Sequence, residues 1–145
     1  MFGACLAALI MLLPGCSSGE TTATAPGTIT PTTPTVPSRT ISGTVSYSGN
    51  VKSSHQIIIV ANRMGEQTPA YSVILRNPGP FSISDVTDAT YTLIAFMDLG
   101  DDMGPPGADE PSGFYDGNGD GKADVVIMTE GKGLAGIDIT LTDPT

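Results

Sequence analysis

One short segment, residues 116–124, has side-chain types and a spacing suited to chemistry. Its sequence DGNGDGKAD places side-chain oxygens at positions 1, 3, 5 and 9, on Asp116, Asn118, Asp120 and Asp124. Alternate residues of a tight turn point the same way, so these oxygens can converge on one hard cation. Gly121 permits the sharp bend, and Lys122 offers its backbone carbonyl oxygen. The spacing therefore predicts a calcium-binding loop.

The loop departs from an EF-hand in its second half. Position 12 is Ile127, where an EF-hand carries a bidentate glutamate. The residues after Asp124 have the pattern of a strand, and no helical period flanks the loop. It resembles instead the calcium loops that dockerins and extracellular β-proteins carry outside the EF-hand fold.

Further acids precede this loop in the chain. Between Asp98 and Asp124 there are eight acidic residues against one base. The candidates for the missing ligands are Asp98, Asp102, Asp109 and Glu110. We expect the two acidic loops to meet and share one or two structural calcium ions. The alternative is a solvated acidic surface in which Asp and Gly serve turn geometry. Zinc and copper are disfavoured because the region holds no His or Cys.

The overall composition narrows the function classes. The chain has 145 residues and a formal charge of -9, and this acid excess argues against nucleic acid as a partner. One histidine, no tryptophan and no legible nucleophile–base arrangement predict a protein that is not an enzyme. A hydrolase would require a deep pocket that holds two close carboxylates.

The elements that must position these acids begin after two non-globular segments. Residues 1–16, MFGACLAALIMLLPGC, hold an apolar run shorter than the roughly 20 residues that span a bilayer, as in a secretory signal. The segment LPGC resembles a bacterial lipobox, which implies a lipid on Cys16 and a place in the cell envelope, at the outer membrane or cell surface. A buried helix, or a cleaved signal with a chance cysteine, is the alternative.

The next segment, residues 17–38, consists almost wholly of Ser, Thr, Pro, Gly and Ala. Proline recurs at every third position at Pro31, Pro34 and Pro37, which favours an extended, flexible linker over a packed core. Such a linker would hold a domain away from the membrane.

Residues 39–145 have the pattern of one β domain. Seven strands are predicted, over residues 40–47, 56–61, 71–76, 81–84, 90–97, 124–129 and 134–142. In the fifth of these, Tyr91, Leu93, Ala95 and Met97 alternate with Ile94 and Phe96, so that each set shares one face. Seven short strands separated by Gly and Pro predict an all-β fold, a seven-stranded antiparallel β-sandwich.

Three segments carry a family resemblance. ISGTVSYSG from Ile41, PGPFSI from Pro78 with ATYTL from Ala89, and FMDLGDDMGPPGADEP from Phe96 occur in the order found in carboxypeptidase-regulatory-like domains. The resemblance implies a prealbumin-like (Ig-like) sandwich and a non-catalytic accessory or surface module.

Relatives in the same broad fold group bind starch, so the resemblance leaves two further functions open. One is a carbohydrate-binding module, in which Tyr47, Tyr71 and Tyr115 would form a stacking platform for a glycan. The other is an accessory subunit of an envelope protein assembly. We expect a lipid-anchored surface protein that displays a calcium-stabilised binding or structural module.

Overall fold

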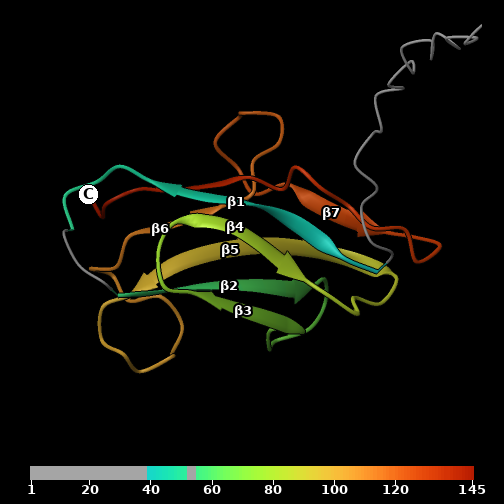
Figure 1. The fold of residues 1–145 in the computed structure, drawn as a ribbon, viewed down its shortest axis with the longest axis horizontal. Helices are drawn as coiled ribbons and strands as arrows, with labels where there is room; N and C mark the ends of the chain where they lie inside the picture. The colour runs from blue at the N-terminus through green and yellow to red at the C-terminus, as the bar shows by residue number, and fades with distance from the viewer. Residues whose placement is uncertain (1–38, 52–54) are drawn as a thin grey trace, which may run out of the picture. The chain divides into compact units, whose positions relative to one another are not determined.

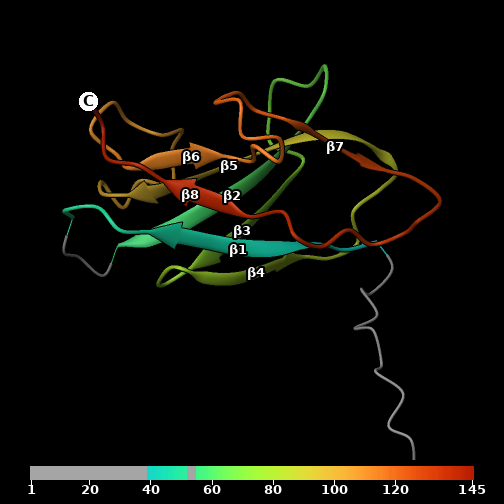
Figure 2. The same cartoon turned by 90° about the horizontal axis from the view of Figure 1, so that it is seen from above.

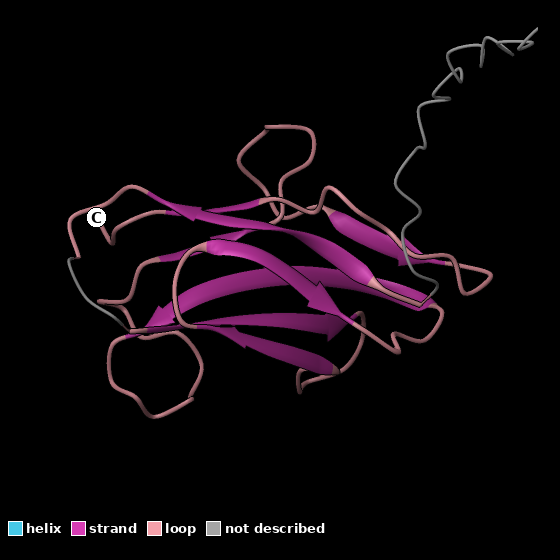
Figure 3. Cartoon of the chain, viewed as in Figure 1, coloured by secondary structure: helices cyan, strands magenta, loops and turns pink. Residues whose placement is uncertain are grey.

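Alternating apolar residues and frequent turns fold the C-terminal part of the chain into two β-sheets. The computed structural model describes residues 39–51 and 55–145, and no helix occurs among them (Figure 3). The predicted signal, the lipidation residue Cys16 and the linker lie outside the described residues. Within the described part, no helix is long and apolar enough to cross a membrane.

Eight strands form the two sheets. They are β1 (Ile41–Tyr47), β2 (Gln56–Arg63), β3 (Tyr71–Leu75), β4 (Gly79–Ile83), β5 (Ala89–Asp98), β6 (Ser112–Phe114), β7 (Val125–Met128) and β8 (Ile139–Leu141). The three-stranded sheet has the order β4-β1-β8, and the five-stranded sheet has the order β3-β2-β5-β6, with β7 also paired to β5. Figures 1 and 2 show the two sheets facing each other.

Strand β5 organises the five-stranded sheet. It pairs with β2 along one edge, antiparallel, from Gln56↔Asp98 to Arg63↔Tyr91. Two short strands pair with its other edge, one after the other. Strand β7 lies opposite residues 89–92 of β5, and β6 lies opposite residues 94–96. The strand ends at Asp98, and the first acidic loop, residues 99–111, follows directly.

The predicted strand set needs two corrections. All seven expected strands occur, but the last is much shorter than residues 134–142, and β6 is an additional strand. Strand β6 has only three residues, with glycine in the middle, so its sequence offers no alternation to detect. The pairing is also not antiparallel throughout. After β7 the chain crosses to the other sheet, where β8 runs parallel to β1, with Val45 opposite Ile139.

The core lies between the two sheets. Tyr91, Leu93, Ala95 and Met97 of β5 all belong to it, as their alternation predicted. The three-stranded sheet contributes Ile41, Val45, Ile139 and Leu141, among others. Among the described residues, the buried members of this core lie between residues 41 and 141.

The two sheets are joined along one side by β6 and β8. The backbones of Ser112 and Thr142 exchange two hydrogen bonds, of 3.1 and 3.0 Å, and Tyr115 bridges to Ile139. The contact is close, since a Cβ added to Gly113 would lie 2.1 Å from the carbonyl oxygen of Thr140. These backbone contacts form a seam between β6 and β8. The seam fixes the position at which the chain enters the second acidic loop, residues 116–124.

Candidate functional site

The loop at residues 116–124 turns around the carboxylate of its first residue. Asp116 Oδ1 accepts hydrogen bonds from the backbone N–H groups of Gly119, at 2.8 Å, and Asp120, at 3.1 Å. Asp116 Oδ2 accepts one from the N–H of Gly121 at 2.8 Å. Gly119 and Gly121 have φ values of 75° and 80°, a region that favours glycine. The sharp turn predicted at Gly121 is confirmed.

The remaining polar side chains of this loop are also held by local hydrogen bonds. Asn118 Oδ1 accepts from Asp120 N–H, and Asp120 Oδ1 accepts from Lys122 N–H, both at 2.9 Å. Asp124 accepts from the backbone N–H and the side-chain amide of Asn118, at 3.0 and 3.1 Å. A carboxylate oxygen has two lone pairs, so each of these oxygens keeps acceptor capacity after one hydrogen bond.

The first acidic loop is held by two carboxylates that the fold buries. The Asp98 side chain is 1% exposed and accepts from the N–H groups of Asp102, at 3.3 Å, and Met103, at 3.0 Å. Glu110 is 9% exposed and accepts from the N–H groups of Leu99 and Gly107, at 2.8 and 2.9 Å. These two carboxylates therefore hold the loop in place, because they accept hydrogen bonds from its backbone N–H groups.

The structure brings three of the predicted ligands of this loop around one hollow. Asp102, Asp109 and Glu110 line a hollow of about 240 Å³. Asp102 and Asp109 are exposed at its rim, and Asp102 accepts a 2.7 Å hydrogen bond from the N–H of Gly104. Asp98 is directed instead to the backbone of residues 102 and 103.

The two acidic loops do not bring their carboxylates together. In Figure 1 they leave the sheets at different places, one after the arrowhead of β5 and the other between β6 and β7. They flank one groove, which Pro106 and Asp116 both line, but no hydrogen bond in the described part of the chain joins their acidic side chains. The reason is β6, whose pairing with β5 inserts a strand between the loops.

The oxygen atoms of these loops are of the kind that binds calcium, although the structure does not bring the carboxylates together around one point. Across residues 39–51 and 55–145, no three His, Cys, Asp or Glu side chains are grouped so as to hold a metal ion. A calcium site in residues 116–124 would also use the amide oxygen of Asn118 and the carbonyl oxygen of Lys122, and both are oxygens of the kind that calcium takes.

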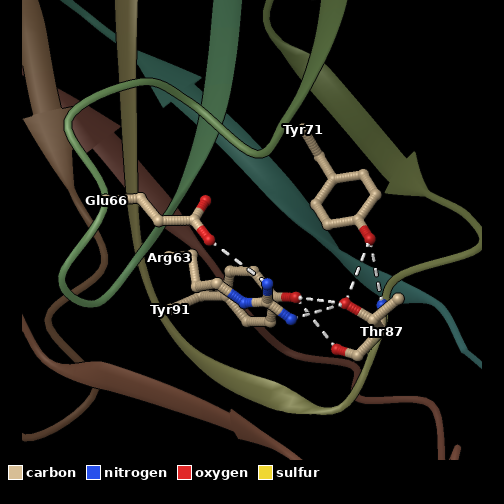
Figure 4. A network of polar contacts seen from close by, with 5 residues as sticks. All are labelled: Arg63, Glu66, Tyr71, Thr87 and Tyr91. Atoms are coloured by element: carbon tan, nitrogen blue, oxygen red, sulfur yellow. Dashed lines mark hydrogen bonds and ion pairs between the residues drawn. The ribbon is translucent and has the colours of Figure 1, made fainter.

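A second polar cluster, shown in Figure 4, was not predicted from the sequence. Thr87 is its centre. Thr87 Oγ1 accepts hydrogen bonds from the Arg63 guanidinium and the Tyr71 hydroxyl. It also contacts the Tyr91 hydroxyl, which donates a 2.9 Å hydrogen bond to the Thr87 carbonyl oxygen. Hydrogen bonds with the side chain and N–H of Thr87 lower the pKa of Tyr71. Arg63 also forms a 3.2 Å ion pair with Glu66. The cluster ties the β2–β3 turn to the start of β5.

The three tyrosines that could form a stacking platform for a glycan are all in contact with the core. Tyr47, Tyr71 and Tyr115 are each partly buried against the core. The rings of Tyr71 and Tyr91 meet edge-on, with centroids 6.0 Å apart and planes at 63°. Tyr47 donates its hydroxyl to Asp143, and burial together with this hydrogen bond raises the pKa of Tyr47.

Comparison with known proteins gives no relative: no family model, no curated protein and no solved structure matches this chain. Its function is therefore inferred from its own residues and their placement.

Proposed function

We propose that this chain is a lipid-anchored protein of the cell envelope, and that it displays a non-catalytic, calcium-stabilised β module at the outer membrane or cell surface. The observation that carries the proposal is the order of three segments. An apolar run ending in LPGC is followed by a Thr/Pro-rich stretch, and then by a β domain with a hydrophobic core built from residues between 41 and 141. Lipidation at Cys16 followed by a linker and a self-contained domain suits display away from a membrane.

For the module itself, we propose a prealbumin-like sandwich of the carboxypeptidase-regulatory-like kind. Two sheets that face each other across one core support this assignment, as does the order of the three resembling segments. The parallel β1–β8 pair and the extra strand β6 are the features in which this chain would differ from the expected seven antiparallel strands.

For the cation, we propose that calcium binds the loop at residues 116–124 and pins it structurally. The support is a turn already wrapped around Asp116, with the oxygens of Asn118, Asp120, Lys122 and Asp124 in the same loop. The hollow lined by Asp102, Asp109 and Glu110 is the candidate for a second ion, and Asp98 holds the backbone of the same loop. Calcium sites in extracellular modules often have dissociation constants of ~10⁻⁴–10⁻³ M.

The lipid anchor is tested by replacing the residue that would carry it. In a bacterial host fed an alkyne fatty acid, the full-length chain should take up the label and sediment with membranes. Cys16→Ser should lose the label entirely and release the protein from the membrane fraction, because no other cysteine follows it in the chain.

The matched control is the other cysteine. Cys5→Ser should keep both the label and the membrane association, since Cys5 precedes the expected cleavage site. Equal labelling of wild type and Cys16→Ser would contradict the anchor.

A second candidate function is that of an accessory subunit in an envelope assembly. One observation favours it: apolar side chains are exposed on the face of the five-stranded sheet that points away from the core, including Ile74, Phe114, Val125 and Ile127.

A further inference from the structure

The outer face of the five-stranded sheet is apolar along its centre. Side chains that alternate with the core residues of β2 and β5 point to this face. Register places Ile58 beside both Ile74 and Phe96, and Ile94 beside both Val60 and Phe114. Ile74 and Phe114, at the two sides of this row, are 41% and 38% exposed. Ile58 and Phe96, at the centre of the row, are only 5% and 2% exposed. The open apolar surface that the partner sheet does not cover is therefore formed by Ile74, Ile94 and Phe114.

Loops turn this floor into a groove. One depression of about 510 Å³ lies over β3, β2 and β5, between Pro69 of the β2–β3 turn and Met103 of the first acidic loop. A second, also of about 510 Å³, lies over β5, β6 and β8. The two share Ile94 and Pro106 in their linings, so they lie side by side across the strands and are treated together as one groove. In Figure 2 the loops that follow β2 and β5 rise on the side away from β1 and β4.

The two ends of the groove differ in charge. The end over β3 and β2 has no charged side chain in its lining. The end over β6 and β8 is lined by Asp116 and Asp138. None of the described residues that line either end is basic. The groove is thus uncharged at one end, where Asn62, Gln67 and Ser72 line it together with apolar residues, and acidic at the other.

We propose that this groove binds an extended polypeptide segment of a partner protein, one that carries apolar side chains followed by Lys or Arg. The apolar residues would lie over Ile74 and Ile94, and the cationic residues would face Asp138. Asp116 is not counted as a partner, because the proposed calcium would use its carboxylate. Three strand spacings of ~4.8 Å separate β3 from β6, a length that about four or five extended residues span. A second copy of this chain fits poorly, because each copy has a formal charge of -9.

This inference rests on the proposed role as a displayed binding module and names its partner class. The test uses the lipid-anchored protein in phosphatidylcholine nanodiscs and a fluorescein-labelled peptide of three leucines followed by three lysines. Fluorescence anisotropy should show saturable binding, and the peptide with glutamate in place of lysine should bind at least tenfold more weakly. Asp138→Asn should weaken binding of the lysine peptide several-fold and reduce its salt dependence, because the amide keeps an acceptor for Thr44 N–H but removes the charge.

The apolar half is tested with a matched pair of substitutions. Ile94→Thr, at the point that both depressions share, should weaken binding at least fivefold. Ile127→Thr makes the same change at a 56% exposed residue that lines neither depression, and it should leave binding unchanged. Melting curves of both variants show whether they are folded.

Four results would overturn the inference. The first is that the lysine peptide does not bind at 1 mM, and the second is that the glutamate peptide binds as tightly as the lysine peptide. The third is that Ile94→Thr and Ile127→Thr change binding equally. The fourth is that sedimentation shows a dimer of the protein, which Ile94→Thr dissociates. Equal binding of both peptides would indicate an apolar ligand of any charge, and the dimer would indicate a second copy in the groove. Loss of lipidation in Cys16→Ser leaves this test unaffected, so failure of the anchor and failure of the groove can be distinguished.

Discussion

Gly113→Ala is expected to lower the free energy of unfolding by about 3 kcal/mol, the upper range for forcing a methyl group into a packed position. The new Cβ would lie 2.1 Å from the carbonyl oxygen of Thr140 and 2.9 Å from its carbonyl carbon, and backbone cannot rotate away as a side chain can. The seam between β6 and β8 would have to open. For a domain of this size the loss corresponds to a fall of roughly 10 °C or more in melting temperature.

Gly79→Ala supplies the matched control. Gly79 also lies in an edge segment of a sheet, in β4, but the nearest atom to an added Cβ is the Asn77 carbonyl oxygen at 4.0 Å. The same chemical change should therefore leave the melting temperature within a few degrees of the wild type. If both alanine variants melted together with the wild type, the close approach of β6 and β8 would be refuted.

Asp98→Ala is expected to lower the free energy of unfolding by a similar amount, about 3 kcal/mol. A hydrogen bond to a charged group contributes about 1.5–3 kcal/mol, and this carboxylate accepts from both Asp102 and Met103 N–H. The site is 1% exposed, so removal also leaves a space that the surroundings fill only in part. Chemical denaturation should show the loss, and amide hydrogen exchange should rise in residues 99–109.

Asp109→Ala is the control for charge in the same loop. Asp109 is exposed, so removing its carboxylate takes away one negative charge without opening a buried space. Its free energy of unfolding should stay within about 0.5 kcal/mol of the wild type. Equal destabilisation by both variants would show that loop charge, rather than the buried Asp98 anchor, determines stability.

The strands that carry strong periodicity were predictable from sequence, and the rest was determined by tertiary contacts. The β-branched run of β2 predicts a strand, and the alternation in β5 predicts both a strand and the face of each of its residues. Strand β6 has no such signal, since three residues around a glycine become a strand only by pairing with β5 and bridging to β8. The parallel β1–β8 pair depends on a crossover between sheets, which no local pattern encodes.

In the acidic loops, too, local features could be predicted from the sequence and contacts between distant residues could not. Spacing within residues 116–124 predicted the turn, because Asp116 and Gly121 act within a few residues of each other. The expected meeting of the two loops required the placement of β6, which was itself not predicted. The Thr87 cluster also joins residues distant in the chain, and a threonine hydroxyl at a strand entry gives no sequence signal.

The most direct test of a calcium-stabilised module is the melting temperature of residues 39–145, which contain the two sheets and the core between them, in EDTA and then in 1 mM calcium. With a dissociation constant near 10⁻⁴ M, calcium would add about 1.4 kcal/mol, a rise of roughly 5 °C or more. Magnesium should give a much smaller rise, and Asp120→Ala should abolish the calcium response. Identical melting of the wild type in EDTA and calcium would contradict the account and leave the acidic loops as a solvated surface.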